Sequence, residues 1–341
     1  MKKTKKILIC TLVLLLAVAG VLFVAWRYAT APFGGEEAVR VNIPSGADAQ
    51  AVRDILQEKL GDSYGGKVAT LWERQGGVAA KAHGSYMVAP GEQAIRVSRA
   101  IMAGRQTPVR LTYNNLRTLG QLAARVAEVL ECDSASFVAA CDSILPEAGF
   151  ARPEQYTAAF LPDTYEFYWT AAAPDVVSKL LATRSAFWND DRRAKAAKLG
   201  LSPVEVATLA SIVEEETNKA DERPKVARLY LNRLARNMQL QADPTVKFAI
   251  GDFSLRRIGA SHLSVDSPYN TYRVTGLPPG PIRVAEASTI DAVLDAPQHN
   301  YLYMCAKSDF SGYHDFAETY NRHRINAARY HMALERRGVK L

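Results

Sequence analysis

An uninterrupted apolar run from Ile7 to Trp26 constrains the fold of this chain more than any other stretch of its sequence. About twenty apolar residues form a helix long enough to cross the hydrocarbon core of a bilayer. A helix also satisfies all of its backbone hydrogen bonds within one segment, as a bilayer requires. Four of the first six residues are lysines. Because positive charge stays on the cytoplasmic side, residues 1–6 are predicted to form a cytoplasmic stub and residues 7–26 a transmembrane helix.

The alternative interpretation of this segment is a cleaved signal peptide. Its apolar core would exceed the roughly 7–15 residues usual for such peptides. The available small-residue cleavage site, Ala29-Thr30-Ala31, is followed by Pro32. A retained anchor in the inner membrane is therefore predicted, with everything after Ala29 on the periplasmic or other extracytoplasmic side.

The length and charge of the chain limit what the rest can be. At 341 residues it can hold two ordinary domains after the anchor. Its net charge of +7 suits an anionic polymer or a membrane surface. No nucleic-acid-binding motif is present, and the basic stretch 322–337 is typical of the solvated face of a terminal helix, so no nucleic-acid partner is predicted. The histidines and cysteines lack metal-ligand spacing, so no metal is predicted.

Alternating and helical patterns after the anchor predict a mixed α+β fold. Strands are expected at 39–43, 84–88 and 109–111, and helices at 49–60, 94–103 and 119–130. Further on, helices are expected at 173–199 with a break near 188–191, at 224–234, at 245–250 and at 319–335. A buried strand is expected at 301–305, followed by a hairpin arm at 312–316.

A central helix is predicted from Ser202 to Thr217. Ser202 is a good N-cap, Pro203 fits the first helical position, and Glu205 completes a capping box. On a helical wheel, Glu216 falls inside the apolar stripe of this helix, whereas Glu214 lies off its centre.

The position of Glu216 on this stripe is compatible with acid–base chemistry. Desolvation on an apolar face raises the pKa of a carboxyl, as a general acid near neutral pH requires. The alternative is that Glu216 only ends the buried stripe and reaches water.

Several ordered blocks resemble the MltG/YceG-like endolytic peptidoglycan transglycosylases. The blocks are Leu209-Ala-Ser-Ile-Val-Glu-Glu-Glu-Thr217, Lys225-Val-Ala-Arg-Leu-Tyr-Leu-Asn-Arg-Leu234, Leu240-Gln-Ala-Asp-Pro-Thr-Val246, Ser267-Pro-Tyr-Asn-Thr-Tyr272, Thr275-Gly-Leu-Pro-Pro-Gly-Pro-Ile282 and Tyr301-Leu-Tyr-Met304, with His314 and His323 flanking Phe316. This resemblance implies a LysM-like region at 36–145 and a catalytic domain at 150–341. The LysM-like units either bind glycan or act as a spacer between membrane and active site.

The resemblance also implies an activity. It implies a lyase that cleaves the bond between N-acetylmuramic acid (MurNAc) and N-acetylglucosamine (GlcNAc) in nascent strands and leaves 1,6-anhydroMurNAc ends, so terminating or releasing glycan chains during cell-wall assembly. Glu216 is the predicted acid–base residue, and Glu214 is the reserve candidate. The implied mechanism needs no cofactor. The expected partners are peptidoglycan strands and the inner membrane, with cell-wall synthases as further candidates.

The substrate-binding candidates combine aromatic rings with polar groups, the mixture that carbohydrate sites use. They are Gln241, Asp243, Tyr269, Asn270, Tyr272 and His314. Asp243 has an equal alternative as the cap of the helix at 245–250. The turn 276–280 is expected to complete a cleft wall with the tyrosines.

Two other function classes stay open. A muramidase would pair Glu216 with Asp243 or Glu214 and release reducing ends. A non-catalytic glycan-binding scaffold would use only the LysM-like units.

Overall fold

The computed structural model describes residues 2–255 and 257–338. Its first element, α1 (Lys2–Ala29), is a helix, as predicted. Residues Lys3–Ala29 form a helix that is long and apolar enough to cross a membrane, and its most apolar stretch is not buried within the protein. This finding is consistent with a single-pass membrane anchor.

The chain divides into two compact units, each formed from separate segments. The first runs to Leu111 and adds residues 128–132 and 165–172. The second comprises residues 112–127, 133–164 and the chain from Ala173 onward. The proposed boundary between residues 145 and 150 therefore falls inside the second unit.

The first unit contains a two-stranded antiparallel sheet in which Val39 pairs with Val88 and Ile43 with Gly84. Its elements are β1 (Val39–Ile43), α2 (Ala49–Leu60), α3 (Asp62–Arg74), α4 (Ala79–Ala82), β2 (Gly84–Val88) and α5 (Ala94–Met102). The predicted strands and helices are confirmed, but α3 was not predicted. Gly65 lies so close to α2 that a Cβ atom there would meet the Leu56 carbonyl oxygen at 2.1 Å. The glycine that weakens the helical signal of α3 thus allows two helices to pack closely.

A second pair of strands follows, β3 (Val109–Tyr113) and β4 (Asp163–Phe167), which form their own sheet. Between them lie α6 (Leu119–Val129), α7 (Ser134–Ile144) and the 3₁₀ helix η1 (Pro153–Ala159). The predicted strand and first helix are confirmed. Tyr165 and Phe167 of β4 are buried and pack within the protein. The LysM-like character of the region stays a prediction.

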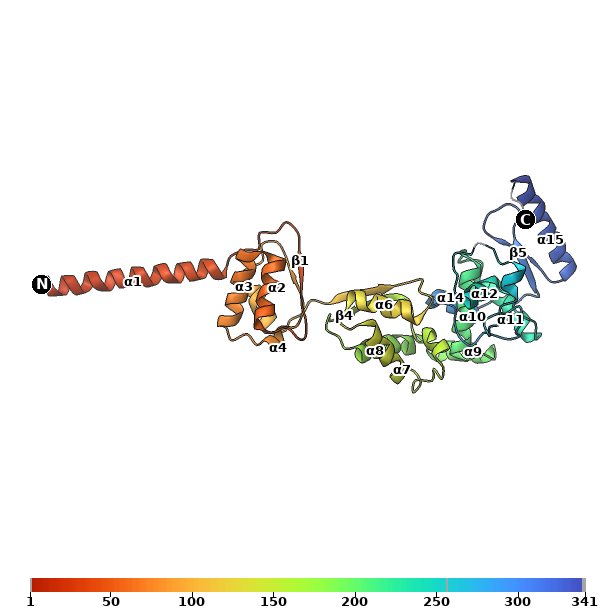
Figure 1. The fold of residues 1–341 in the computed structure, drawn as a ribbon, viewed down its shortest axis with the longest axis horizontal. Helices are drawn as coiled ribbons and strands as arrows, with labels where there is room; N and C mark the ends of the chain where they lie inside the picture. Colours follow the sequence, from red (N-terminus) through yellow and green to blue (C-terminus); the bar gives the residue numbers. More distant parts are fainter. Residues whose placement is uncertain (1, 256, 339–341) are drawn as a thin grey trace. The chain divides into compact units, whose positions relative to one another are not determined.

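The second unit is built around α10 (Pro203–Glu216), which packs against α11 (Arg223–Ala235), α12 (Asp243–Ile250) and α14 (Ala287–Leu294). Figure 1 shows these helices in green to blue. The remaining elements are α8 (Ala173–Phe187), α9 (Asp190–Lys198), α13 (Ala260–Leu263), β5 (Tyr303–Ala306), β6 (His314–Ala317) and α15 (Tyr320–Arg336). Strands β5 and β6 form an antiparallel hairpin that packs on α15. The chain is therefore a mixed α+β protein.

The predicted capping box begins α10. The Ser202 hydroxyl accepts a hydrogen bond from the Glu205 N–H at 3.3 Å, and the Glu205 carboxylate accepts one from the Ser202 N–H at 2.7 Å. The predicted single apolar stripe is wrong, because every residue from Val206 to Glu214 is buried. Other elements cover this part of the helix on all sides, so a helical wheel cannot separate a buried face from an exposed one.

Candidate active site

A cavity of about 410 Å³ lies at the C-terminal end of α10. Its walls come from α10, α11, the start of α12, the loop at Tyr272, the β5–β6 hairpin and the start of α15. The lining residues are Glu216, Leu229, Tyr230, Arg233, Gln241, Asp243, Tyr272, Tyr303, Met304, Cys305, Ala306, His314, Tyr320 and His323.

Glu216, the last residue of α10, is half-buried in this cavity. The Tyr230 hydroxyl donates a 2.7 Å hydrogen bond to its Oε1. Burial raises the pKa of Glu216 to about 7, and the charge of Asp243 adds to the rise, while the Tyr230 hydrogen bond opposes it. A carboxyl with this pKa holds a proton near neutral pH and can also give it up, which is the property of a general acid–base group.

Tyr230 and Arg233 were not predicted as site residues. Both belong to the buried face of α11. Arg233 donates hydrogen bonds to the Leu240 carbonyl at 2.7 Å and to Gln241 Oε1 at 2.8 Å. Arg233 therefore holds the loop before α12 and fixes the position of Gln241 in the cavity.

Asp243 also lines the cavity, as the first residue of α12. The Tyr272 hydroxyl donates a 2.6 Å hydrogen bond to its Oδ1. The alternative role of Asp243 as a helix cap is wrong, because Ala242 occupies the N-cap position and the helix begins at Asp243 itself. Asp243 and Tyr272 thus form a joined polar pair in the same cavity as Glu216.

His314 reaches the cavity from β6. Its Nδ1 lies 2.8 Å from Glu222 Oε2, and its backbone N–H donates to Glu222 Oε1 at 2.8 Å. Sequence reasoning missed Glu222, because it lies in a polar connection after α10 and its partner is far along the chain.

Two of the substrate-binding candidates do not line this cavity. Tyr269 is buried against Phe248, with ring centroids 4.7 Å apart. Asn270 has no exposed surface. Its amide donates to the carbonyls of Leu263 and Val265 at 2.9 and 2.8 Å, so it holds the loop that carries Tyr272.

The turn that was expected to complete the cleft wall lies elsewhere. Thr275 to Pro279 line a different cavity of about 680 Å³, together with Ser202 and Glu205 at the start of α10. The aromatic surface near Glu216 is provided instead by Tyr303 and Tyr320.

His323 also lines the cavity, although it was not predicted as a site residue. Its ring stacks on Tyr303 with centroids 5.5 Å apart. Burial, followed by the nearby Arg233, lowers the pKa of His323.

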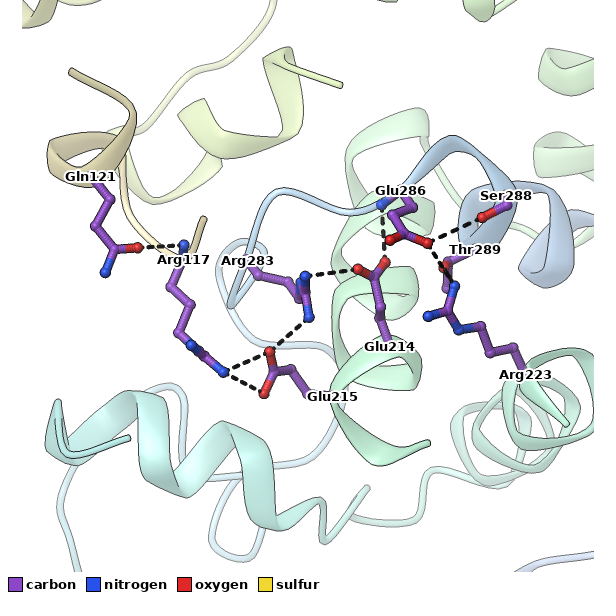
Figure 2. Close-up of polar contacts among 9 residues, drawn as sticks. All are labelled: Arg117, Gln121, Glu214, Glu215, Arg223, Arg283, Glu286, Ser288 and Thr289. Atoms are coloured by element: carbon purple, nitrogen blue, oxygen red, sulfur yellow. Dashed lines mark hydrogen bonds and ion pairs between the residues drawn. The ribbon is translucent and has the colours of Figure 1, made fainter. Parts of the chain in front are cut away.

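Glu214 does not line this cavity. It belongs to an ion network with Arg283 and its neighbours (Figure 2). It is 3% exposed, lies 3.0 Å from Arg283 and accepts the Glu286 N–H at 2.9 Å. Burial raises its pKa, and these two contacts oppose the rise. Glu215 bonds Arg117 and Arg283, each at 2.9 Å. The three consecutive glutamates therefore have different surroundings, and Glu216 is the one at the cavity.

Within the described residues, no group of three or more His, Cys, Asp or Glu side chains is arranged to hold a metal ion.

A family model described as YceG-like family matches residues 41–329. An endolytic murein transglycosylase of Bacillus subtilis (strain 168) is 28% identical over 290 residues, covering 80% of this chain and 79% of that protein. One of Streptococcus pneumoniae (serotype 2, strain D39) is 30% identical over 149 residues, covering 42% of this chain but 27% of that protein. The crystal structure of a YceG-like protein from Listeria monocytogenes has a TM-score of 0.57 and 26% identity, covering 85% of this chain and 99% of that one.

Proposed function

This chain belongs to the YceG-like family, and we propose that it is a membrane-anchored endolytic lytic transglycosylase acting on peptidoglycan. The curated relatives that match it carry the name endolytic murein transglycosylase. The observation that carries the proposal is Glu216, a carboxyl with a pKa raised to about 7 at the wall of a polar and aromatic cavity.

Glu216 acts twice in the proposed reaction. Tyr230 donates to Oε1, so the acidic proton sits on Oε2. That proton passes to the glycosidic oxygen between MurNAc and GlcNAc, and the bond from this oxygen to the muramic C1 breaks. The resulting carboxylate then takes the proton of the muramic C6 hydroxyl, whose oxygen bonds to C1. The products are a 1,6-anhydroMurNAc end and a free GlcNAc hydroxyl, and Glu216 is protonated again without water.

The other cavity residues bind and orient the glycan. Asp243 and Gln241 offer hydrogen-bond acceptors and donors to sugar hydroxyls and amides. Tyr320 is 60% exposed, and its ring provides a flat apolar surface for a pyranose face. Tyr303 adds a second ring in the same wall.

The apolar helix α1 supports a location at the membrane. We place residues 1–6 in the cytoplasm and the two units on the periplasmic or extracytoplasmic side of the inner membrane, because lysines precede the apolar run. Nascent strands leave their synthases at this surface, so the enzyme would meet its substrate there and terminate or release the strands. Cell-wall synthases are therefore candidate partners.

Mass spectrometry of strands digested by the purified chain tests the proposal. Internal cuts that leave 1,6-anhydroMurNAc ends are expected. Asp243 lies in the same cavity as Glu216 and could serve a hydrolase as its second carboxylate. Reducing muramic ends would therefore assign a muramidase, and intact strands that remain bound to the protein would assign a glycan-binding scaffold.

A further inference from the structure

Three hydrogen bonds converge on the buried side chain of Glu222, which precedes α11. This residue is 5% exposed. Its Oε1 accepts from the His314 backbone N–H at 2.8 Å, and its Oε2 accepts from the Thr217 hydroxyl at 3.0 Å. The His314 Nδ1 lies 2.8 Å from the same Oε2. With donors at both oxygens, the group is satisfied as a carboxylate, which accepts hydrogen bonds and donates none.

This arrangement decides which nitrogen of His314 carries the hydrogen. Because Oε2 can only accept, Nδ1 must be the donor of their bond. In a neutral imidazole the second nitrogen, Nε2, is then an acceptor. No hydrogen bond to Nε2 is found within the described part of the chain, and the imidazole lines the cavity of Glu216.

We propose that Glu222 is a positioning residue of the active site: it fixes the His314 imidazole with Nδ1 protonated, so that Nε2 accepts a hydrogen bond from a hydroxyl of the bound sugar. The inference rests on the proposed function for the identity of the ligand as a glycan. A hydroxyl that donates to Nε2 has its oxygen lone pairs directed away from the ring, so His314 orients the hydroxyl within the cavity.

The same carboxylate links His314 to the acid–base residue. Thr217 directly follows Glu216, and its hydroxyl bonds the Oε2 atom that also bonds Nδ1. Glu222 therefore holds the end of α10 and the start of β6 together, which fixes the spacing between Glu216 and the imidazole. Small displacements of groups in an active site lower rates by up to roughly 100-fold.

The variant Glu222→Gln separates this role from simple packing. An amide has one acceptor oxygen and one NH₂ donor group, whereas the carboxylate has two acceptor oxygens. If its NH₂ group faces Nδ1, the imidazole hydrogen moves to Nε2, which then becomes a donor. If the amide turns around, the NH₂ group meets the His314 backbone N–H and that bond is lost.

Asp221→Asn is the matched control. Asp221 is the neighbouring residue and accepts a hydrogen bond from the Tyr313 hydroxyl at 3.0 Å, next to the Glu222–His314 contact. Neither Asp221 nor Tyr313 lines the cavity. This variant removes the same charge from the same connection without touching the imidazole.

The experiment is ¹⁵N NMR of the full-length chain in detergent micelles, with its six histidines labelled and the His314 signals assigned from their loss in His314→Asn. We expect Nδ1 protonated and Nε2 unprotonated in the native chain and in Asp221→Asn. Glu222→Gln should either move the hydrogen to Nε2 or, with the amide turned around, lose the bond to the His314 backbone N–H. In both cases kcat/KM for strand cleavage should fall by about 10- to 100-fold.

Two results would overturn the inference. One is a native His314 whose hydrogen sits on Nε2, a measurement that needs no variant to fold. The other is a folded Glu222→Gln chain that keeps both the native tautomer and the native rate. The tautomer is measured without substrate, so it tests the Glu222 contact independently of the reaction. A native chain that fails to cleave peptidoglycan would refute the proposed function. That result would also remove the sugar ligand from this inference.

Discussion

The substitution Glu216→Gln should change the pH dependence of stability in a direction that follows from its surroundings. In the unfolded chain this carboxyl ionises near its ordinary pKa of 4.5, whereas in the folded chain it ionises at about 7. Between these values the unfolded state binds fewer protons than the folded state. The free energy of unfolding therefore falls as pH rises through this window and levels off above it. Glutamine does not titrate, so the variant lacks this loss.

The size of the effect follows from the shift. A difference between 4.5 and about 7, at about 1.4 kcal/mol for each pKa unit, gives an upper value of about 3 kcal/mol. Glu216 is half-buried and keeps some contact with solvent in the cavity, which reduces this figure. As pH rises from 4 to 8, we therefore expect the free energy of unfolding of Glu216→Gln to increase by about 1–3 kcal/mol relative to that of the native chain.

Urea unfolding of the full-length chain in detergent micelles, followed by tryptophan fluorescence, measures this gain. Trp188 is the tryptophan of the second unit and is 2% exposed in the same core as α10. Glu318→Gln removes an exposed carboxyl from the same unit and controls for the change in net charge. A variant that loses stability relative to the native chain as pH rises would show that the fold favours the Glu216 carboxylate, and would refute the assignment of a general acid.

Further predictions concern the surroundings of the site, the ion network, the reaction and the anchor. Tyr230→Phe removes a hydrogen bond that lowers the pKa of Glu216, so the alkaline limb of the pH–kcat/KM profile should move to higher pH; movement to lower pH would contradict this. Arg283→Leu leaves Glu214 buried without its ion partner and should cost about 3–5 kcal/mol of unfolding free energy in urea; a cost below about 1 kcal/mol, the usual value of an exposed pair, would contradict it. A chelator should leave strand cleavage unchanged, because both proton transfers are assigned to Glu216; loss of activity that a divalent cation restores would contradict this. The chain should stay in membranes after an alkaline carbonate wash, and a soluble form beginning near Pro32 would contradict the anchor.

Elements whose signals are local could be predicted from the sequence. The helix predicted at 49–60 begins where Asp48 caps it, and the capping box of Ser202 and Glu205 sets the start of α10. Elements that depend on tertiary contacts, such as α3, could not be predicted in this way. The glycine in α3 favours a loop when it is considered alone, and its value appears only where α2 packs on it.

The site shows the same division. Glu216, Gln241, Asp243, Tyr272 and His314 come from four separate segments and line one cavity. Their residue types, together with the family resemblance of the blocks that contain them, predict a carbohydrate site. The local sequence does not indicate which residues of a motif face the cavity. In the block 267–272, the side chain of Tyr272 reaches the cavity. Tyr269 packs on Phe248, and Asn270 bonds the backbone of the preceding loop.

Long-range partners explain the remaining omissions. Glu222 bonds a residue 92 positions later, and Glu214 bonds one that follows it by 72 positions. The helical wheel ranked Glu214 as the less buried glutamate, because a wheel includes only one helix and not the elements that cover it. In the structure, Arg283 and the loop at Glu286 enclose Glu214.

The central claim is that Glu216, and not Glu214, is the acid–base residue. Its most direct test compares strand cleavage by Glu216→Gln and Glu214→Gln, with circular dichroism showing that both are folded at the assay temperature. General acid–base catalysis typically contributes roughly 10²–10⁴-fold, and one group used twice should reach the upper end. Glu216→Gln should therefore lose about 10⁴-fold in rate, while Glu214→Gln keeps substantial activity. An inactive Glu214→Gln beside an active Glu216→Gln would contradict the claim and exchange the two roles.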